Sequence, residues 1–171
     1  MRPPALLVRL DRAAGELGGI DPRLIEPGVS NLAVAAVGAR EPGDVAAITG
    51  GLVVCDGTVR PAGPVAYGAD PGLARAALTA VRFESDVRAV ASLRPLPALV
   101  RALEEHLREV AVVDPRLTPP GVSTMDWAIA RASEGGVPDG VLVDGGALLL
   151  FAATIEEVAD EIIMLSSHAS I

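Results

Sequence analysis

The sequence predicts an α/β domain in which helices cover both faces of a mixed sheet. Segments with helical spacing of apolar residues alternate with short aliphatic runs, and two pairs of these runs are joined by glycine-containing turns typical of hairpins. The 171 residues suffice for one domain with a substantial core. Because hairpins occur beside strand–helix alternation, we expect a mixed sheet rather than a purely parallel one, within a single domain over residues 1–171.

The first half of the chain predicts two helices, one strand and one hairpin. Glycines at 18 and 19 stop the first helix, and Asp70-Pro71 starts the second as N-cap and first helical residue. In chain order these elements are a helix at 6–17, a strand at 31–37, a hairpin of 52–55 with 58–60 around Asp56-Gly57, and a helix from 70 to about 83.

The second half alternates strands and helices and then ends in a hairpin and a helix. Capping boxes at Ser123 and Thr154 each open a helix. The expected order is a strand at 87–93, a helix from Pro97 through Leu107, a strand at 110–113, a helix after Ser123, a hairpin of 140–144 with 147–152 turned at Gly145-Gly146, and a helix from Thr154 to about Leu165.

Composition limits both the core and the chemistry. Half of the residues are hydrophobic but only 2% are aromatic, so Ala, Val, Leu and Ile must form the core. All 14 basic residues are Arg, which excludes a Schiff base, a phosphate-binding P-loop lysine and a lysine general base. Arginine in place of lysine, with Asn31 as the single Asn and no Gln, fits a GC-rich genome or growth at high temperature.

Net charge and cysteine content limit which kinds of partner and which cellular compartment we expect. The net charge of 14 − 22 = −8 and the scarcity of aromatic residues argue against direct nucleic-acid binding by this chain. Cys55 is alone, which excludes an internal disulfide, and we expect it to be a small core residue. Neither a signal peptide nor an apolar run long enough to span a bilayer is visible, so we expect a cytoplasmic protein without membrane partners.

The residues by themselves contain no complete catalytic constellation. His106 and His168 are far apart in the sequence and lack cysteine partners, so a zinc site is not expected. Asp44 and Asp144 lie near glycines and could each offer one carboxylate to Mg²⁺, but turn or cap duty is the favoured interpretation. Arg75 follows the start of its helix by one turn, where it could bind an anion or form a surface ion pair. These features predict at most a small anionic ligand.

Five segments, in order, resemble the ThiN family of thiamine-phosphate synthases, from about Leu24 to Val158. Ser30-Asn31 resembles the family's S-N-I/L, 44–48 resembles D-V-A-A/G-I-P-G-R, Gly68-Ala69 with Ala74-Arg75 resembles G-A-S-x-H-x-A-R, 123–127 resembles S-T-x-x-W, and Val137-Pro-Asp139 resembles V-P-D. The resemblance implies a three-layer α/β/α fold with a mixed, mostly antiparallel sheet, like class II aldolases and AraD. As ligand-binding candidates it implies Ser30, Asn31, Asp44, Gly68, Arg75, Ser123 and Thr124, although Ser123 and Thr124 could serve as helix caps alone.

The family joins a hydroxymethylpyrimidine diphosphate to a thiazole phosphate and releases diphosphate with Mg²⁺. This chain departs from the pattern at the positions that matter for that chemistry. Gly51 replaces the Arg of P-G-R and Gly72 replaces the His of G-A-S-x-H, with the separation kept at 72 − 51 = 21. The family's G-x-x-G-K-E-P loop is cut down to 144–147, without Lys or Glu. Because a departing diphosphate needs cations and donors, these losses argue against catalysis.

Three hypotheses follow. The leading one is a domain with no catalytic or metal-binding residues and no cofactor, which binds thiamine phosphate or a related pyrimidine or thiazole phosphate as a sensor. Family members often follow a pyrimidine kinase domain, or a helix-turn-helix in regulators, so a sensor would act through a partner or as a metabolite buffer. The second is a divergent synthase that uses Asp44 and Asp144 for Mg²⁺ and other arginines for phosphate. The third is an assembly subunit without a ligand; a homodimer through Leu- and Ala-rich helices is expected.

Overall fold

A seven-stranded sheet forms the middle of the molecule. The structure, a computed structural model, describes residues 2–106 and 108–169. Every neighbouring pair of strands is antiparallel except β7 and β8, which are parallel. The strand order is β5 (Val65–Tyr67), β2 (Val45–Ile48), β1 (Asn31–Ala35), β6 (Ala89–Leu93), β9 (Leu148–Ala152), β8 (Gly140–Val143) and β7 (Val110–Val113).

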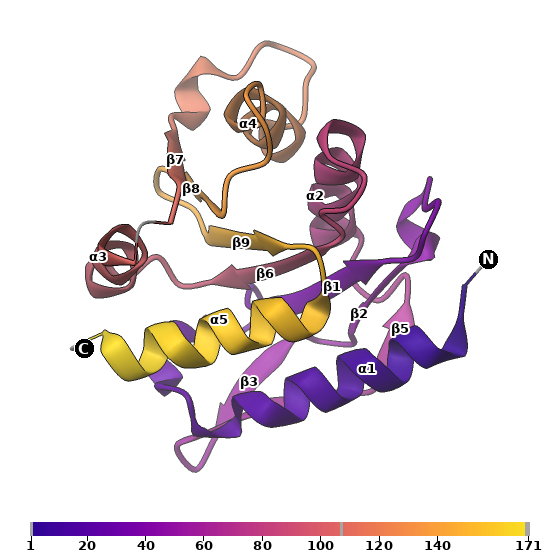
Figure 1. The fold of residues 1–171 in the computed structure, drawn as a ribbon, viewed down its shortest axis with the longest axis vertical. Helices are drawn as coiled ribbons and strands as arrows, with labels where there is room; N and C mark the ends of the chain where they lie inside the picture. The colour runs from indigo at the N-terminus through magenta and orange to yellow at the C-terminus, as the bar shows by residue number, and fades with distance from the viewer. Residues whose placement is uncertain (1, 107, 170–171) are drawn as a thin grey trace.

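Helices cover both faces of this sheet (Figure 1). One layer consists of α1 (Pro4–Gly15), α3 (Pro97–Glu105) and α5 (Ile155–His168), and the other of α2 (Pro71–Phe83) and α4 (Thr124–Ala132). Each layer encloses its own hydrophobic core, because alternate side chains of the central strands point to opposite faces. The predicted three-layer α/β/α architecture and its mixed, mostly antiparallel sheet are confirmed.

The two terminal helices α1 and α5 lie side by side and run in the same direction (Figure 1). In the middle of α1, Arg9 forms two hydrogen bonds to the carboxylate of Glu156 at the start of α5, with N–O distances of 2.6 and 2.7 Å. In the segment after α1, the Asp21 N–H donates to Ser166 Oγ near the end of α5 at 2.8 Å. These contacts fasten the first and last helices of the described chain to one another.

The predicted hairpin at 52–60 is present as a separate two-stranded sheet, β3 (Leu52–Cys55) and β4 (Thr58–Pro61). Asp56 and Gly57 form its turn with φ of 51° and 74°, the left-handed conformation that a two-residue hairpin loop requires. Leu52 and Val59 are buried beneath the main sheet's helices. The prediction that Cys55 is a core residue is wrong: it lies next to the turn and is exposed.

The sequence reading missed the strands β2 and β5. Strand β2 is Ala-rich and β5 has three residues, so neither shows the β-branched, alternating pattern by which strands are recognised. The predicted strand from Asn31 ends at Ala35, two residues early, and the last helix continues to His168. Helix α3 ends at Glu105; the predicted extension to Leu107 reaches outside the described residues.

Strand β7 closes one side of the sheet as an edge strand. Its Val112 is 66% exposed, and Leu117, shortly after the strand, is 69% exposed. Among the described residues no helix has the length and apolarity needed to cross a membrane.

Candidate functional site

Asn31 lies at the start of β1 and connects three elements. It is 2% exposed, and its Nδ2 donates to the Ile48 carbonyl and to Asp70 Oδ2, both at 3.0 Å. Its Oδ1 accepts from the N–H groups of Leu32 and Ile48 at 2.8 and 3.2 Å. The side chain therefore ties β1 to β2 and to the N-cap residue of α2, and its amide has no hydrogen-bonding capacity left over.

The two glycines that replace the Arg and His of the family pattern lie at this same corner. Gly51 has φ of 74°, and a β-carbon there would collide with the carbonyl oxygen of Ser30. A β-carbon at Gly72 would meet nothing closer than Asp70 Oδ1 at 3.6 Å. Ser30 itself is 1% exposed, and its Oγ accepts from the Glu26 N–H at 2.8 Å. A side chain is therefore excluded at Gly51 and has room at Gly72. We name the region of Ser30, Asn31, Gly51 and Gly72 the glycine corner.

Asp44 lies at the other end of β1 and β2, where it holds a turn. Its Oδ2 accepts from the N–H groups of Arg40 and Glu41 at 3.0 and 3.2 Å, and its Oδ1 accepts from Arg2 Nε at 3.0 Å. The Arg40 N–H, followed by the Arg2 guanidinium, lowers the pKa of the Asp44 carboxyl to about 2. This carboxylate therefore fixes the backbone of the loop that carries Arg40.

A hollow of about 310 Å³, which we name the arginine pocket, lies between α2, α4 and the Arg40 loop. Three arginines and one carboxylate line it. None of these arginines forms an ion pair within the described part of the chain, and Asp126 Oδ1 is buried without a hydrogen-bond partner there. The lining residues are Arg40, Pro42, Arg75, Leu78, Thr79, Arg82 and Asp126.

The structure divides the sequence-predicted residues between these two places. Arg75 lines the arginine pocket directly, and Asp44 holds the loop that contributes Arg40. Gly68 adjoins that loop, since a β-carbon at Gly68 would lie 3.7 Å from Gly43 Cα, and its N–H donates to the Val45 carbonyl of β2 at 3.0 Å. Ser123 caps α4, which carries Asp126, by accepting from the Asp126 N–H at 3.4 Å, and Thr124 is the exposed first residue of that helix. Ser30 and Asn31 lie apart, at the glycine corner.

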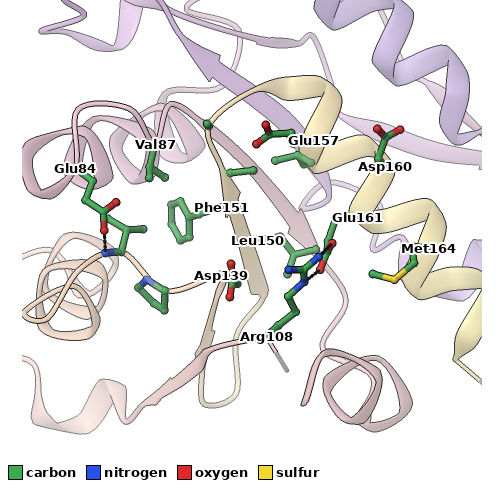
Figure 2. Close-up of a pocket in the computed structure, with 15 residues that line it drawn as sticks. Glu84, Val87, Arg108, Asp139, Leu150, Phe151, Glu157, Asp160, Glu161 and Met164 are labelled. Carbon is green, nitrogen blue, oxygen red and sulfur yellow. Dashed lines mark hydrogen bonds and ion pairs between the residues drawn. The ribbon is translucent and has the colours of Figure 1, made fainter. Parts of the chain in front are cut away.

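A larger cavity, of about 610 Å³, has the opposite charge. Figure 2 shows it between α5, β9 and the segment that carries the Val137-Pro-Asp139 motif. Five carboxylates and Arg108 line it, which gives 1 − 5 = −4, and Arg108 is already held by Glu161 at 2.8 and 3.0 Å. The lining carboxylates are those of Glu84, Asp139, Glu157, Asp160 and Glu161. Such a cavity repels a phosphate.

The structure separates Asp44 from Asp144 and brings the two histidines together. Asp44 precedes β2 and Asp144 follows β8, four strands away and at the opposite end of the sheet, so the two carboxylates cannot share one ion. The ring centroids of His106 and His168 are 4.9 Å apart, although the two residues are far apart in the sequence. Even so, no group of three potential metal-ligating side chains occurs among residues 2–106 and 108–169.

Three charged residues of the arginine pocket, Arg40, Arg82 and Asp126, were not among the site residues that the sequence predicted. Arg82 follows Arg75 by seven residues on a helix that the sequence predicts, so two turns of helical spacing would have placed them on one side. No sequence signal places Arg40 beside them, because the loop and the helix meet only through the fold.

Known proteins are similar to this chain in sequence and in architecture. Residues 9–164 match the family model of thiamine-phosphate synthase ThiN. The bifunctional thiamine biosynthesis protein ThiDN of Methanocaldococcus jannaschii is 32% identical over 120 residues, which are 68% of this chain and 28% of that protein. The chain thus spans less than a third of the length of that relative.

Solved structures with similar sequences have the same fold as this chain. The C-terminal domain of protein MJ0236 superposes with a TM-score of 0.87 at 26% identity, covering 95% of this chain and 93% of that domain. The C-terminal domain of a phosphomethylpyrimidine kinase gives 0.83 at 28% identity, covering 94% and 98%. The L-fuculose-1-phosphate aldolase of Thermus thermophilus, at 17% identity, 85% and 82% coverage and a TM-score of 0.53, shares the fold alone. The chain belongs to the ThiN family of thiamine-phosphate synthases.

Proposed function

We propose that this ThiN-family domain binds thiamine phosphate, or a related pyrimidine or thiazole phosphate, without catalysing its formation. The observation that carries the proposal is the glycine corner. At Gly51, where the family pattern has Arg, a side chain would collide with the Ser30 backbone, and Gly72 replaces the His. A departing diphosphate would meet neither cation there, and removal of one such group costs an enzyme on the order of 3 kcal/mol of transition-state stabilisation.

A divergent synthase is the second candidate, and one observation favours it. The three arginines of the arginine pocket form no ion pair within the described residues, so their positive charge is available to a substrate. Only Arg75 of the three lies in a segment that resembles the family pattern. A synthase that used this charge would have to hold Mg²⁺ without a joint site of Asp44 and Asp144.

Thermal unfolding and turnover together separate the two candidates. The purified chain is heated with thiamine, thiamine phosphate or thiamine diphosphate at millimolar concentration. A ligand present at about 100 times its Kd stabilises a protein by about 2.7 kcal/mol, which raises the Tm of a domain of this size by roughly 5–10 °C. We expect such a rise with thiamine phosphate.

The same preparation is then incubated with hydroxymethylpyrimidine diphosphate, thiazole phosphate and Mg²⁺, beside a catalytically competent thiamine-phosphate synthase. We expect no thiamine phosphate above background. Product formation would replace the proposal with the divergent synthase, and the absence of any Tm change with all three thiamine compounds would remove the binding function.

A further inference from the structure

We propose that the arginine pocket is the site that holds the phosphate or diphosphate group of the ligand, with Arg40, Arg75 and Arg82 as its cationic contacts. The inference rests on the proposed function for the organic part of the ligand, whereas the anion chemistry follows from the pocket alone. Neither Arg40 nor Arg82 belongs to the sequence segments that resemble the family.

Charge is the first argument. The pocket contains three arginines and one aspartate, 3 − 1 = +2, in a chain whose net charge is −8. Of the 14 − 3 = 11 arginines outside the pocket, six pair with a carboxylate within 3.2 Å in the described chain, namely Arg2, Arg9, Arg23, Arg108, Arg116 and Arg131. A phosphate monoester carries about −1 when singly protonated and about −2 when fully ionised, so one such group would offset half or all of this charge.

Geometry is the second argument. Arg75 and Arg82 are seven residues apart on α2 and therefore lie on the same side of the helix, two turns from each other. Arg40 comes from a different segment, the loop between β1 and β2, and lines the same hollow. Guanidinium groups from two separate segments can therefore approach one phosphate from different directions and contact different oxygens.

The pocket is also firmly built. Its floor consists of Leu78 and Thr79, which are 8% and 5% exposed, and the Thr79 hydroxyl donates to the Arg75 carbonyl at 2.8 Å. Asp44 fixes the Arg40 loop through the N–H groups of Arg40 and Glu41. Because the loop backbone is already ordered, ligand binding does not incur the entropic cost of ordering it.

Asp126 adds an acceptor. Its Oδ1 is buried and lacks a hydrogen-bond partner within the described residues, a state that costs free energy unless a ligand or solvent donates to it. The hydroxyl of a singly protonated phosphate is such a donor. The pocket would thus offer guanidinium donors to the charged oxygens and one carboxylate to the protonated oxygen.

Calorimetric titration of the full chain with inorganic diphosphate, thiamine phosphate and unphosphorylated thiamine tests the assignment. The variants are Arg40→Gln and Arg82→Gln. Arg12→Gln is the matched control, because Arg12 is an exposed arginine on α1, on the opposite side of the sheet. We expect each pocket variant to weaken diphosphate and thiamine phosphate binding by about tenfold or more, since a hydrogen bond to a charged group contributes that much. Thiamine binding and the control should change less than about twofold.

The outcomes separate the site from the function. Diphosphate binding that depends on Arg40 and Arg82, with no binding of any thiamine compound, would support the pocket and sink the proposed function. Thiamine phosphate binding that is equally tight in wild type, Arg40→Gln and Arg82→Gln would overturn the pocket and leave the function standing. If a Gln variant lowers the Tm without ligand, Arg40→Lys or Arg82→Lys replaces it, because Lys keeps the charge but loses the paired donors of the guanidinium. Diphosphate binding weaker than in Arg12→Gln at the same ionic strength would support the pocket, and binding as tight as in Arg12→Gln would overturn it.

Discussion

The two ends of α2 use polar groups in opposite ways. At its N-terminal end, the side-chain amide of Asn31 makes all of its hydrogen bonds within the protein, one of them to Asp70. Further along the helix, Arg75 and Arg82 face a hollow without an ion pair in the described chain. Satisfied buried polar groups stabilise a fold, whereas unpaired charges beside a cavity remain available to a ligand. The comparison separates residues that hold the architecture from residues that could recognise a phosphate.

The largest expected effect on stability is at Gly51, in the glycine corner beside the N-terminal end of α2. Gly51→Arg, which restores the residue of the family pattern, places a side chain on a backbone with φ of 74° and against the Ser30 carbonyl. We expect the free energy of unfolding, measured with urea, to fall by about 3 kcal/mol or more. Gly72→His is the control, because its site is open, and it should change stability by less than about 1 kcal/mol. Equal stability of the two variants would mean that the corner is not closed.

The next effect concerns Asn31. Asn31→Ala removes four hydrogen bonds and leaves Asp70 Oδ2 without its donor, so we expect a loss of about 2–4 kcal/mol in the free energy of unfolding. Thr124→Ala, at another sequence-predicted site residue, should cost less than about 0.5 kcal/mol because Thr124 is exposed. A stable Asn31→Ala protein with weakened ligand binding would reassign Asn31 from the architecture to the site.

The smallest effect depends on pH and concerns the loop beside the arginine pocket. The pKa of Asp44 in the folded protein is about 2, below its usual value of 3.8, so its ionised form contributes stability above about pH 4. That contribution is lost as the pH falls from about 4 to about 2. We expect the Tm difference between wild type and Asp44→Asn to be largest near neutral pH and to shrink over this window. A constant difference across it would show that the Asp44 charge does not hold the Arg40 loop.

The sequence predicted the fold class and most of the helices and strands, but it missed two strands of the sheet and most of the site. Helical spacing, the Asp70-Pro71 start and the two capping boxes place α2, α4 and α5, because these signals are local. Strands β2 and β5 carry no such signal and form because neighbouring strands supply their partners. Arg75 stood out beside its helix start, whereas Arg40 joins it only once the sheet has brought its loop to α2.

At one edge of the sheet, the outward-facing backbone N–H and C=O groups form no hydrogen bonds to another strand within the described residues. Strand β7 presents its free edge there, with the largely exposed Val112 projecting from it. An uncovered strand of this kind is a template on which another polypeptide can align, and native proteins usually blunt it with charge or proline. Val112 is not among the residues that line the arginine pocket, so a charged residue at Val112 would protect this edge without removing a proposed phosphate contact.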